Sequence, residues 1–212
     1  MDQQEELLNP WRSMWRKPRA TIQQIVDTDP RHMVLVLAAL AGIFQSLDRA
    51  IDNERAATVE LPMIFLLSAV IGSIGGIITL YISSSLIRFT GKLFSGKGSA
   101  LNLRAALAWA NVPTIWALLL MILAAVVFGK ELFTGEVQAH EWSLTSSISY
   151  AVFGLSIMIL GIWSFILMLK SIGQVQGFSA WMALANVILA FLIVFIPFMA
   201  FILLFLFAGG PH

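Results

Sequence analysis

The sequence predicts an all-α membrane protein: a polytopic bundle of five transmembrane helices with short interfacial helices at its N-terminus. Of the 212 residues, 58% are hydrophobic and only 12% are charged, whereas soluble domains average about 45–50% and about 25%. A soluble domain of this size cannot bury so large an apolar fraction in one core. Five apolar segments come close to or exceed the length of about 20 residues that a membrane-spanning helix needs.

Polar loops separate the five segments. The segments are residues 30–47, 61–89, 105–128, 144–169 and 180–207. In the first, Asp29 is expected to cap the helix and Pro30 to occupy its first position, where proline is favoured. That segment reaches only about 27 Å at 1.5 Å per residue, near the lower limit for a span. The chain therefore divides into an interfacial segment (1–29), a transmembrane domain (30–207) and a short tail (208–212).

Lysine and arginine are distributed unevenly between the two sets of loops. Ten lie before the first segment or in the loops after the second and fourth: Arg12, Arg16, Lys17, Arg19, Arg31, Arg88, Lys92, Lys97, Arg104 and Lys170. Three lie on the opposite side: Arg49, Arg55 and Lys130. Because cytoplasmic loops carry an excess of basic residues, we expect a cell-membrane protein with its N-terminus in the cytoplasm and its C-terminus outside.

Aromatic and basic residues occupy different faces of the segment before the first span. They are Trp11, Met14 and Trp15 on one side and Arg12, Arg16 and Lys17 on the others. Such a pattern is typical of a short helix in the headgroup layer, with its aromatic face down and its basic face toward anionic lipid. A second short helix is expected at 19–26. We predict a membrane-surface anchor, which either docks a partner or only sets the orientation.

Ionisable residues are absent from the interior of the five segments. Such residues usually mark ion pathways, proton relays or catalytic groups, so their absence argues against a proton-coupled transporter and against most membrane enzymes. In an outer loop, His140 and Glu141 have no further ligand at a spacing suited to a metal site, and the chain has no cysteine. We therefore predict no catalytic residue, metal or cofactor. A net charge of +1 gives no field that would attract nucleic acid.

Two asparagines lie inside the apolar segments. Asn111 and Asn186 are each about 10 Å from the cytoplasmic end of their span by helical rise. Both occur in the string Ala-x-Ala-Asn-Val. A hydrogen bond between the two amides, or from each to a backbone carbonyl, would contribute about 0.6 kcal/mol. We interpret them as packing contacts, with a polar substrate site as the alternative.

Small residues recur every four positions in the second segment. They are Ser68, Gly72 and Gly76, with Gly75 in a parallel row. This spacing lets two helix backbones approach closely. The neighbour is expected to be another helix of the same chain, with a second protomer as the alternative.

Four groups of residues, taken in order, carry a resemblance to a known family. They are Asn9-Pro10-Trp11 with Lys17-Pro18-Arg19, the basic loop 91–99, the small-aromatic-x-x-x-Pro pattern in 106–113, and Trp163, Lys170 and 176–179. From residue 9 to about residue 200 the chain resembles the Ypt-interacting-protein (YIP) family, specifically its small bacterial members.

The YIP resemblance implies a five-span membrane protein with a cytoplasmic N-terminus and no established catalytic residues. Eukaryotic relatives carry a longer N-terminal region and act in vesicle trafficking through Rab-type GTPases. The present chain has only about thirty residues before its first span. That difference argues against a Rab-binding role and favours a bacterial plasma-membrane protein.

Two functions fit these observations. The first is a non-enzymatic scaffold, accessory subunit or membrane organiser that contacts the lipid bilayer, other membrane proteins or a second copy. The alternative is a carrier or flippase for a lipid or weakly polar molecule, because Pro113 and Pro197 each remove a backbone hydrogen bond and broken helices line cavities in transporters. A cavity that reaches both asparagines would favour the carrier, and a tightly packed bundle would favour the scaffold.

Overall fold

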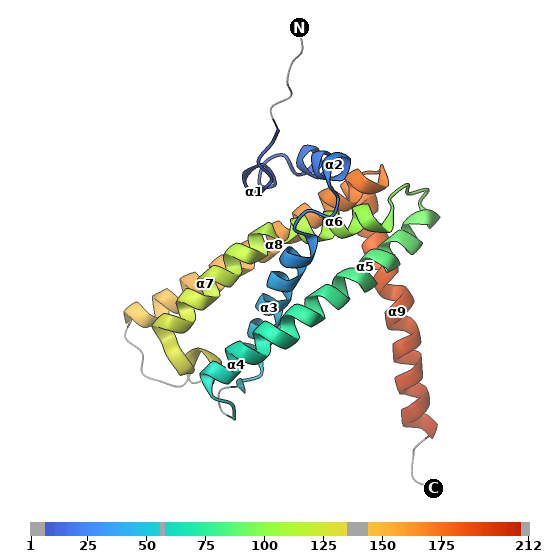
Figure 1. Ribbon diagram of the computed structural model, residues 1–212. Helices are drawn as coiled ribbons and strands as arrows, with labels where there is room; N and C mark the ends of the chain where they lie inside the picture. The colour runs from blue at the N-terminus through green and yellow to red at the C-terminus, as the bar shows by residue number, and fades with distance from the viewer. Residues whose placement is uncertain (1–6, 56–57, 135–143, 209–212) are drawn as a thin grey trace.

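The computed structural model describes residues 7–55, 58–134 and 144–208, and these ranges contain helices, turns and loops but no strand. Within them, five helical segments are long and apolar enough to cross a membrane (Figure 1), which confirms the predicted fold class. They are Val34–Asp52, Leu61–Leu93, Ala100–Phe133, Leu144–Gln176 and Ala180–Phe205. The loop with His140 and Glu141, and the tail from 209 onward, lie outside the described residues.

Three spans are single α-helices and two are interrupted. The single helices are α3 (Val34–Asp52), α8 (Leu144–Gln176) and α9 (Ala180–Ala208). The second span consists of α4 (Leu61–Leu67), a π-helical turn η2 (Ser68–Gly72) and α5 (Ser73–Leu93). The third consists of α6 (Ala100–Ala110), α7 (Val112–Phe128) and a 3₁₀ turn η3 (Gly129–Phe133). Several of these helices extend beyond the predicted apolar segments. Their last turns are polar, so hydropathy alone placed the ends of these segments too early.

The first span begins four residues later than predicted. The Asp29 carboxylate accepts a hydrogen bond from the backbone N–H of Arg31 at 2.9 Å, and Met33 adopts a left-handed conformation with φ 55°. An aspartate bonded to the backbone two residues later forms a local turn that competes with helix. The prediction that Pro30 opens the helix is therefore wrong, and α3 starts at Val34.

Two short helices cover one end of the bundle, which we call the capped end. They are α1 (Pro10–Ser13) and α2 (Pro18–Thr28), at the top of Figure 1. The Asn9 side chain accepts from the Trp11 N–H and caps α1. On α2, Ile22 and Ile25 are buried, and this helix packs on α8 and α6. The N-terminal segment is thus folded onto the bundle.

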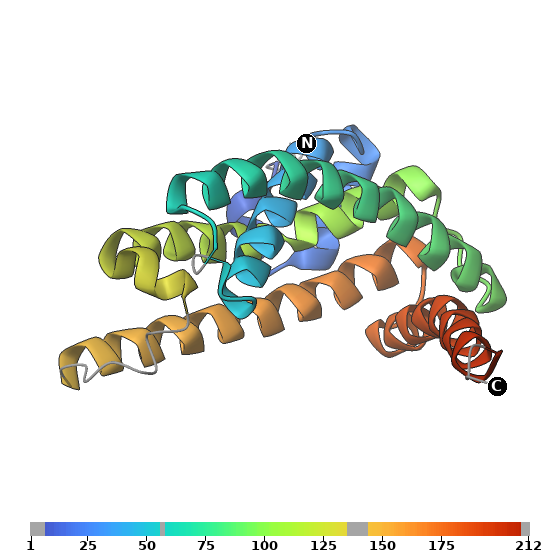
Figure 2. The same cartoon turned by 90° about the horizontal axis from the view of Figure 1, so that it is seen from below.

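The helix α3 lies at the centre and packs against α5, α6 and α7 (Figure 2). One apolar cluster fills the capped half of the bundle around Trp109, Leu103 and Ile172. A second cluster fills the opposite half around Met121 and Phe133. Together they pack four of the five spans into one leg of the molecule, and the first cluster also includes Ala183 and Ala190 near the start of α9.

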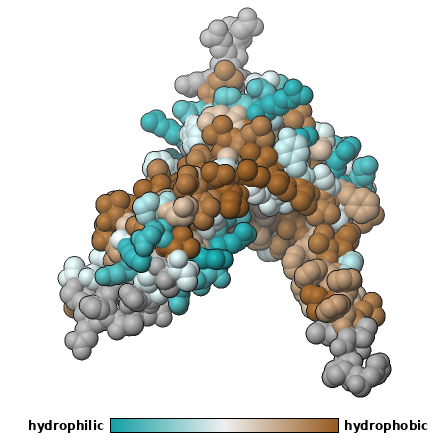
Figure 3. Space-filling model, turned by 60° about the horizontal axis from the view of Figure 1, so that its bottom comes forward, coloured by the Kyte–Doolittle hydropathy of each residue, from teal (hydrophilic) through white to brown (hydrophobic). Residues whose placement is uncertain are grey.

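The fifth span, α9, forms a separate leg. It packs on α8 and α5, but its buried side chains among the described residues are only Ala183, Asn186 and Ala190. Beyond Ala190 it diverges from the bundle, and Figure 3 shows the surface hollowed between two legs. Pro197 lies inside this leg, and the helix continues on both sides of it.

Candidate functional site

The predicted small-residue row packs against α3 of the same chain. Gly42 of α3 faces Gly72 and Gly76, and a Cβ added at Gly42 would lie 2.7 Å from the Gly76 Cα. A Cβ added at Gly75 would meet nothing within 4 Å. Ser68 is buried and accepts a hydrogen bond from a serine of α3 at 3.1 Å. The backbones of α3 and of the second span are therefore in direct contact. Three of the four predicted packing residues, Ser68, Gly72 and Gly76, take part in this contact.

Asn186 lies in a buried polar cluster at the capped end. Its amide donates to the Ile87 carbonyl at 3.2 Å, and its carbonyl oxygen accepts from the Thr90 hydroxyl. Gln176 donates to the same Ile87 carbonyl at 3.2 Å and accepts from the Gly98 N–H at 3.0 Å. We call Thr90, Gln176 and Asn186 the polar clamp, because these side chains join α5, the loop after it, α8 and α9.

Three glycines make room for the polar clamp. A Cβ added at Gly91 or at Gly96 would lie 2.9 Å from the amide carbon of Gln176, and one at Gly98 would lie 3.0 Å from its oxygen. The Gln176 side chain is 2% exposed, so it has no space to move aside. The clamp residues Thr90 and Gln176 were not predicted as a site. In the sequence, the two residues could be recognised only as a threonine and a glutamine just after the apolar segments 61–89 and 144–169.

Asn111 lies apart from Asn186, at the break between α6 and α7. Its backbone has ψ 6°, outside the helical range, and its amide donates to the Leu107 carbonyl at 2.9 Å. The two asparagines therefore bond to backbone carbonyls and not to each other. Of the two predicted arrangements, a bond between the amides or a bond from each to a backbone carbonyl, the structure has the bonds to carbonyls.

The break in the third span is fastened to α8. Pro113 lies in the first turn of α7, directly after the break. The carbonyl of Ala110, the last residue of α6, accepts a hydrogen bond from the Ser164 hydroxyl at 2.8 Å. Thr114 lies 3.1 Å from the same hydroxyl. Backbone groups released at a break must find partners inside a membrane, and α8 supplies one.

A cavity of about 420 Å³ lies beside the break, between α3, α5, α6, α7, α8 and the start of α9. Six uncharged polar side chains line it: Gln45, Thr79, Ser83, Asn111, Thr114 and Ser164. In the ranges that the structure describes, the side chains of Gln45, Thr79 and Ser83 form no hydrogen bond. This amide and these two hydroxyls lie within the apolar spans and have no partner among the described residues, so they can form hydrogen bonds with a bound molecule or with water.

The cavity reaches Asn111 but not Asn186, which is enclosed in the polar clamp. No ionisable side chain of the described residues lines it. Gln45 was not predicted as part of a site, although an amide within the apolar stretch 37–47 was a visible signal. The cavity lies where α9 diverges, as Val187 of α9 forms part of its wall.

The predicted surface anchor rests on protein at its aromatic side. Met14 is fully buried, and the Trp11 ring meets the Trp109 ring edge-on at 5.6 Å. Trp109 in turn donates its indole N–H to the His32 carbonyl at 3.2 Å. Trp11 and Met14 thus face the bundle where lipid was expected. The basic side chains Arg12, Arg16 and Lys17 are exposed.

Comparison with family models matches residues 11–202 to the Yip1 domain. This range contains the polar clamp, the cavity and nearly all of the five spans. Searches of the curated proteins and of the solved structures returned no match. The match agrees with the resemblance carried by the sequence motifs, and it covers most of the chain. The chain belongs to the Yip1 domain family, a family of membrane proteins.

Proposed function

We propose that this protein is a non-enzymatic scaffold or membrane organiser of the cell membrane, oriented with its N-terminus in the cytoplasm. It acts through helix–helix and lipid contacts made by α9. The supporting observation is that no described side chain of α9 beyond Ala190 is buried. A helix that is apolar on all sides is normally covered by neighbouring helices or lipid. The exposed part of α9 is therefore available to contact lipid and other membrane proteins.

The base of α9 is held firmly, which supports this role. In the polar clamp, Asn186 of α9 and Gln176 at the end of α8 both donate to the Ile87 carbonyl of α5. In the small-residue row, by contrast, Gly72 and Gly76 are covered by α3 and offer no surface to a partner. We therefore expect the part of α9 beyond Ala190 to make the contacts with other membrane proteins, while the polar clamp holds the start of the helix in place.

Site-specific photo-crosslinking tests this proposal. A photoreactive residue replaces Phe198 in α9, and a matched control replaces Ile82 in α5; these side chains are 58% and 55% exposed. In native membranes we expect protein adducts from Phe198 and only lipid adducts from Ile82. Purified protein in vesicles then distinguishes a second copy from another protein. Lipid adducts alone at both positions would contradict the scaffold.

The cavity supports a second candidate, a carrier for a lipid or other weakly polar molecule. Among the described residues, its wall offers three polar side chains without hydrogen-bond partners and no ionisable group. Reconstituted vesicles with labelled lipids test this function, with Gln45→Leu as the variant and Gln23→Leu, outside the spans, as the control. Movement no faster than in protein-free vesicles, across a broad lipid panel, would rule out the carrier.

A further inference from the structure

We propose that the capped end holds a binding site for one anionic phospholipid. Arg12, Arg16 and Lys17 contact the phosphate-bearing headgroup, and a groove between α7 and α8 holds an acyl chain. Two hollows that share a boundary carry this inference. It goes beyond the proposed function, since a bound lipid fits a scaffold and a carrier alike.

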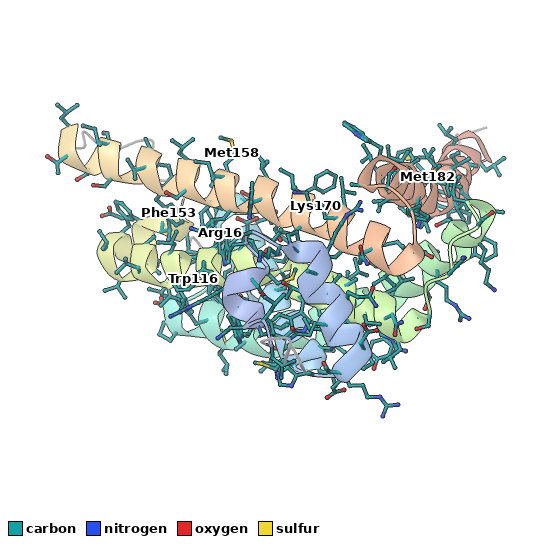
Figure 4. All side chains as sticks on the ribbon, turned by 90° about the horizontal axis from the view of Figure 1, so that it is seen from above. Arg16, Trp116, Phe153, Met158, Lys170 and Met182 are labelled. Atoms are coloured by element: carbon teal, nitrogen blue, oxygen red, sulfur yellow. The ribbon has the colours of Figure 1, made fainter. Side chains whose placement is uncertain are left out.

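The first hollow is open and measures about 720 Å³. Its wall includes three basic side chains (Arg12, Arg16 and Lys17) and three indoles (Trp11, Trp15 and Trp116). Figure 4 shows Arg16 and Trp116 near one another in the view onto the capped end. Tryptophan is enriched at headgroup depth, where an apolar ring meets polar surroundings. The composition of this hollow therefore suits the polar end of a lipid.

The second hollow is apolar and continues from the first. It measures about 420 Å³, and Trp15 and Trp116 line both hollows. Four leucines complete its wall: Leu119, Leu120, Leu123 and Leu160. Positions 116, 119, 120 and 123 recur on one face of α7, so the groove extends about 10 Å along that helix. It leads from the basic residues toward the middle of the span, as an acyl chain would.

The charges in the first hollow are not neutralised by the described chain. None of Arg12, Arg16 and Lys17 forms a salt bridge within residues 7–55, 58–134 and 144–208. No acidic side chain of these ranges lines the hollow. Guanidinium and ammonium groups form strong, charge-assisted hydrogen bonds with phosphate, and clustered basic residues at the membrane surface select anionic lipids. The continuous apolar groove favours a lipid over a soluble phosphate compound.

This site is separate from the cavity between α3, α5 and α8, because the two share no lining residue among those the structure describes. The described lining of the cavity is uncharged and suits a neutral molecule. The surface site combines three cations with an aliphatic groove. Charge selectivity therefore distinguishes the two sites in experiments.

Native mass spectrometry of the full chain in detergent tests the headgroup part. The probes are phosphatidylglycerol and phosphatidylcholine with identical acyl chains. We expect phosphatidylglycerol to bind at least about tenfold more tightly, and added salt to reduce this preference. The variant R12Q/R16Q/K17Q should bind both lipids equally. The control R88Q/K92Q/K97Q removes the same charge from the end of α5 and the loop after it, also at the capped end, and should keep the preference.

Two further arms test the groove and the folding of the variants. Leu123→Trp fills the groove and should weaken binding of both lipids by a similar factor, leaving their ratio unchanged. Glycerol phosphate, which has a headgroup but no chains, should not displace the lipid. R12K/R16K keeps the charge and should keep the preference, which separates charge loss from misfolding.

Three results would overturn the proposal. The first is equal affinity of the unaltered protein for both lipids. The second is an equal loss of preference in the two triple variants, which would indicate a general surface charge. The third is displacement of the lipid by glycerol phosphate, which would indicate a soluble ligand.

Discussion

Gly42 permits the close approach of α3 and α5. Because a Cβ at this position would lie 2.7 Å from the Gly76 Cα, Gly42→Ala must push two backbones apart. We expect a loss of roughly 1–3 kcal/mol in the free energy of unfolding, the usual effect of overpacking. Equilibrium unfolding of the purified protein in mixed detergent micelles measures it.

Gly75 provides the matched control for that experiment. It lies one residue before Gly76 on the same helix, and a Cβ added there meets open space. Gly75→Ala should leave the unfolding free energy unchanged or raise it by about 0.5–1 kcal/mol, because alanine favours helix over glycine. Equal destabilisation by both substitutions would contradict the backbone contact.

Asn186 and Asn111 occur in the same short string but should differ in their effect on stability. Removal of the Asn186 side chain deletes its bonds with the Thr90 hydroxyl and the Ile87 carbonyl, which link α9 to α5, although Thr90 can still donate to the Leu86 carbonyl. We expect Asn186→Ala to cost about 1–2 kcal/mol. Asn111 bonds only within its own segment and faces the cavity, so Asn111→Ala should cost a few tenths of a kcal/mol. The same unfolding assay compares them, and equal costs would contradict the larger contribution expected from Asn186.

At the scale of elements, hydropathy was enough to predict all five spans but not their ends. A long stretch of apolar residues specifies a membrane-spanning helix because, in lipid, the backbone N–H and C=O groups must form hydrogen bonds within the segment. The ends depend on local competition, as the Asp29 turn before α3 shows. They also depend on tertiary contacts, since the polar last turn of α8 is buried beneath the loop after α5.

The candidate sites were harder to predict because they join distant segments. Gln176 and Ile87 are 89 positions apart, and Asn186 and Ile87 are 99 apart. The two asparagines were recognised as intramembrane polar groups, but one sequence does not specify which carbonyl or hydroxyl each one meets. The cavity groups Gln45, Thr79 and Ser83 come from two helices whose contact depends on Gly42, which the small-residue row did not include.

The α6–α7 break yields a prediction at the element scale. Ser164 donates to the Ala110 carbonyl from α8, so Ser164→Ala should loosen the break by about 1 kcal/mol, or about fivefold in local opening. Hydrogen exchange of peptides covering 107–116 should speed up accordingly. Ser156 bonds to Val152 within α8 itself, and Ser156→Ala should leave these peptides unaffected. Unchanged exchange in Ser164→Ala would mean that the break needs no support from α8.

At the scale of the whole molecule, the two ends differ in chemistry. The capped end carries α1, α2, the ends of α5 and α8 and the start of α6, and together with the adjoining loops these elements hold ten of the thirteen basic residues. The opposite end carries the start of α4 and η3. This arrangement agrees with the charge asymmetry between the loops, which predicts that the capped end faces the cytoplasm.

Cysteine labelling tests that orientation, because the chain contains no native cysteine. Thr58 and Ser95 are exposed and flank the second span at opposite ends. In cells with a sealed plasma membrane, a membrane-impermeant maleimide should label Thr58→Cys. It should label Ser95→Cys only after permeabilisation. The reverse pattern would invert the proposed orientation, and with it the leaflet of the lipid site. Labelling of both from outside would mean that the segment between them does not cross the bilayer.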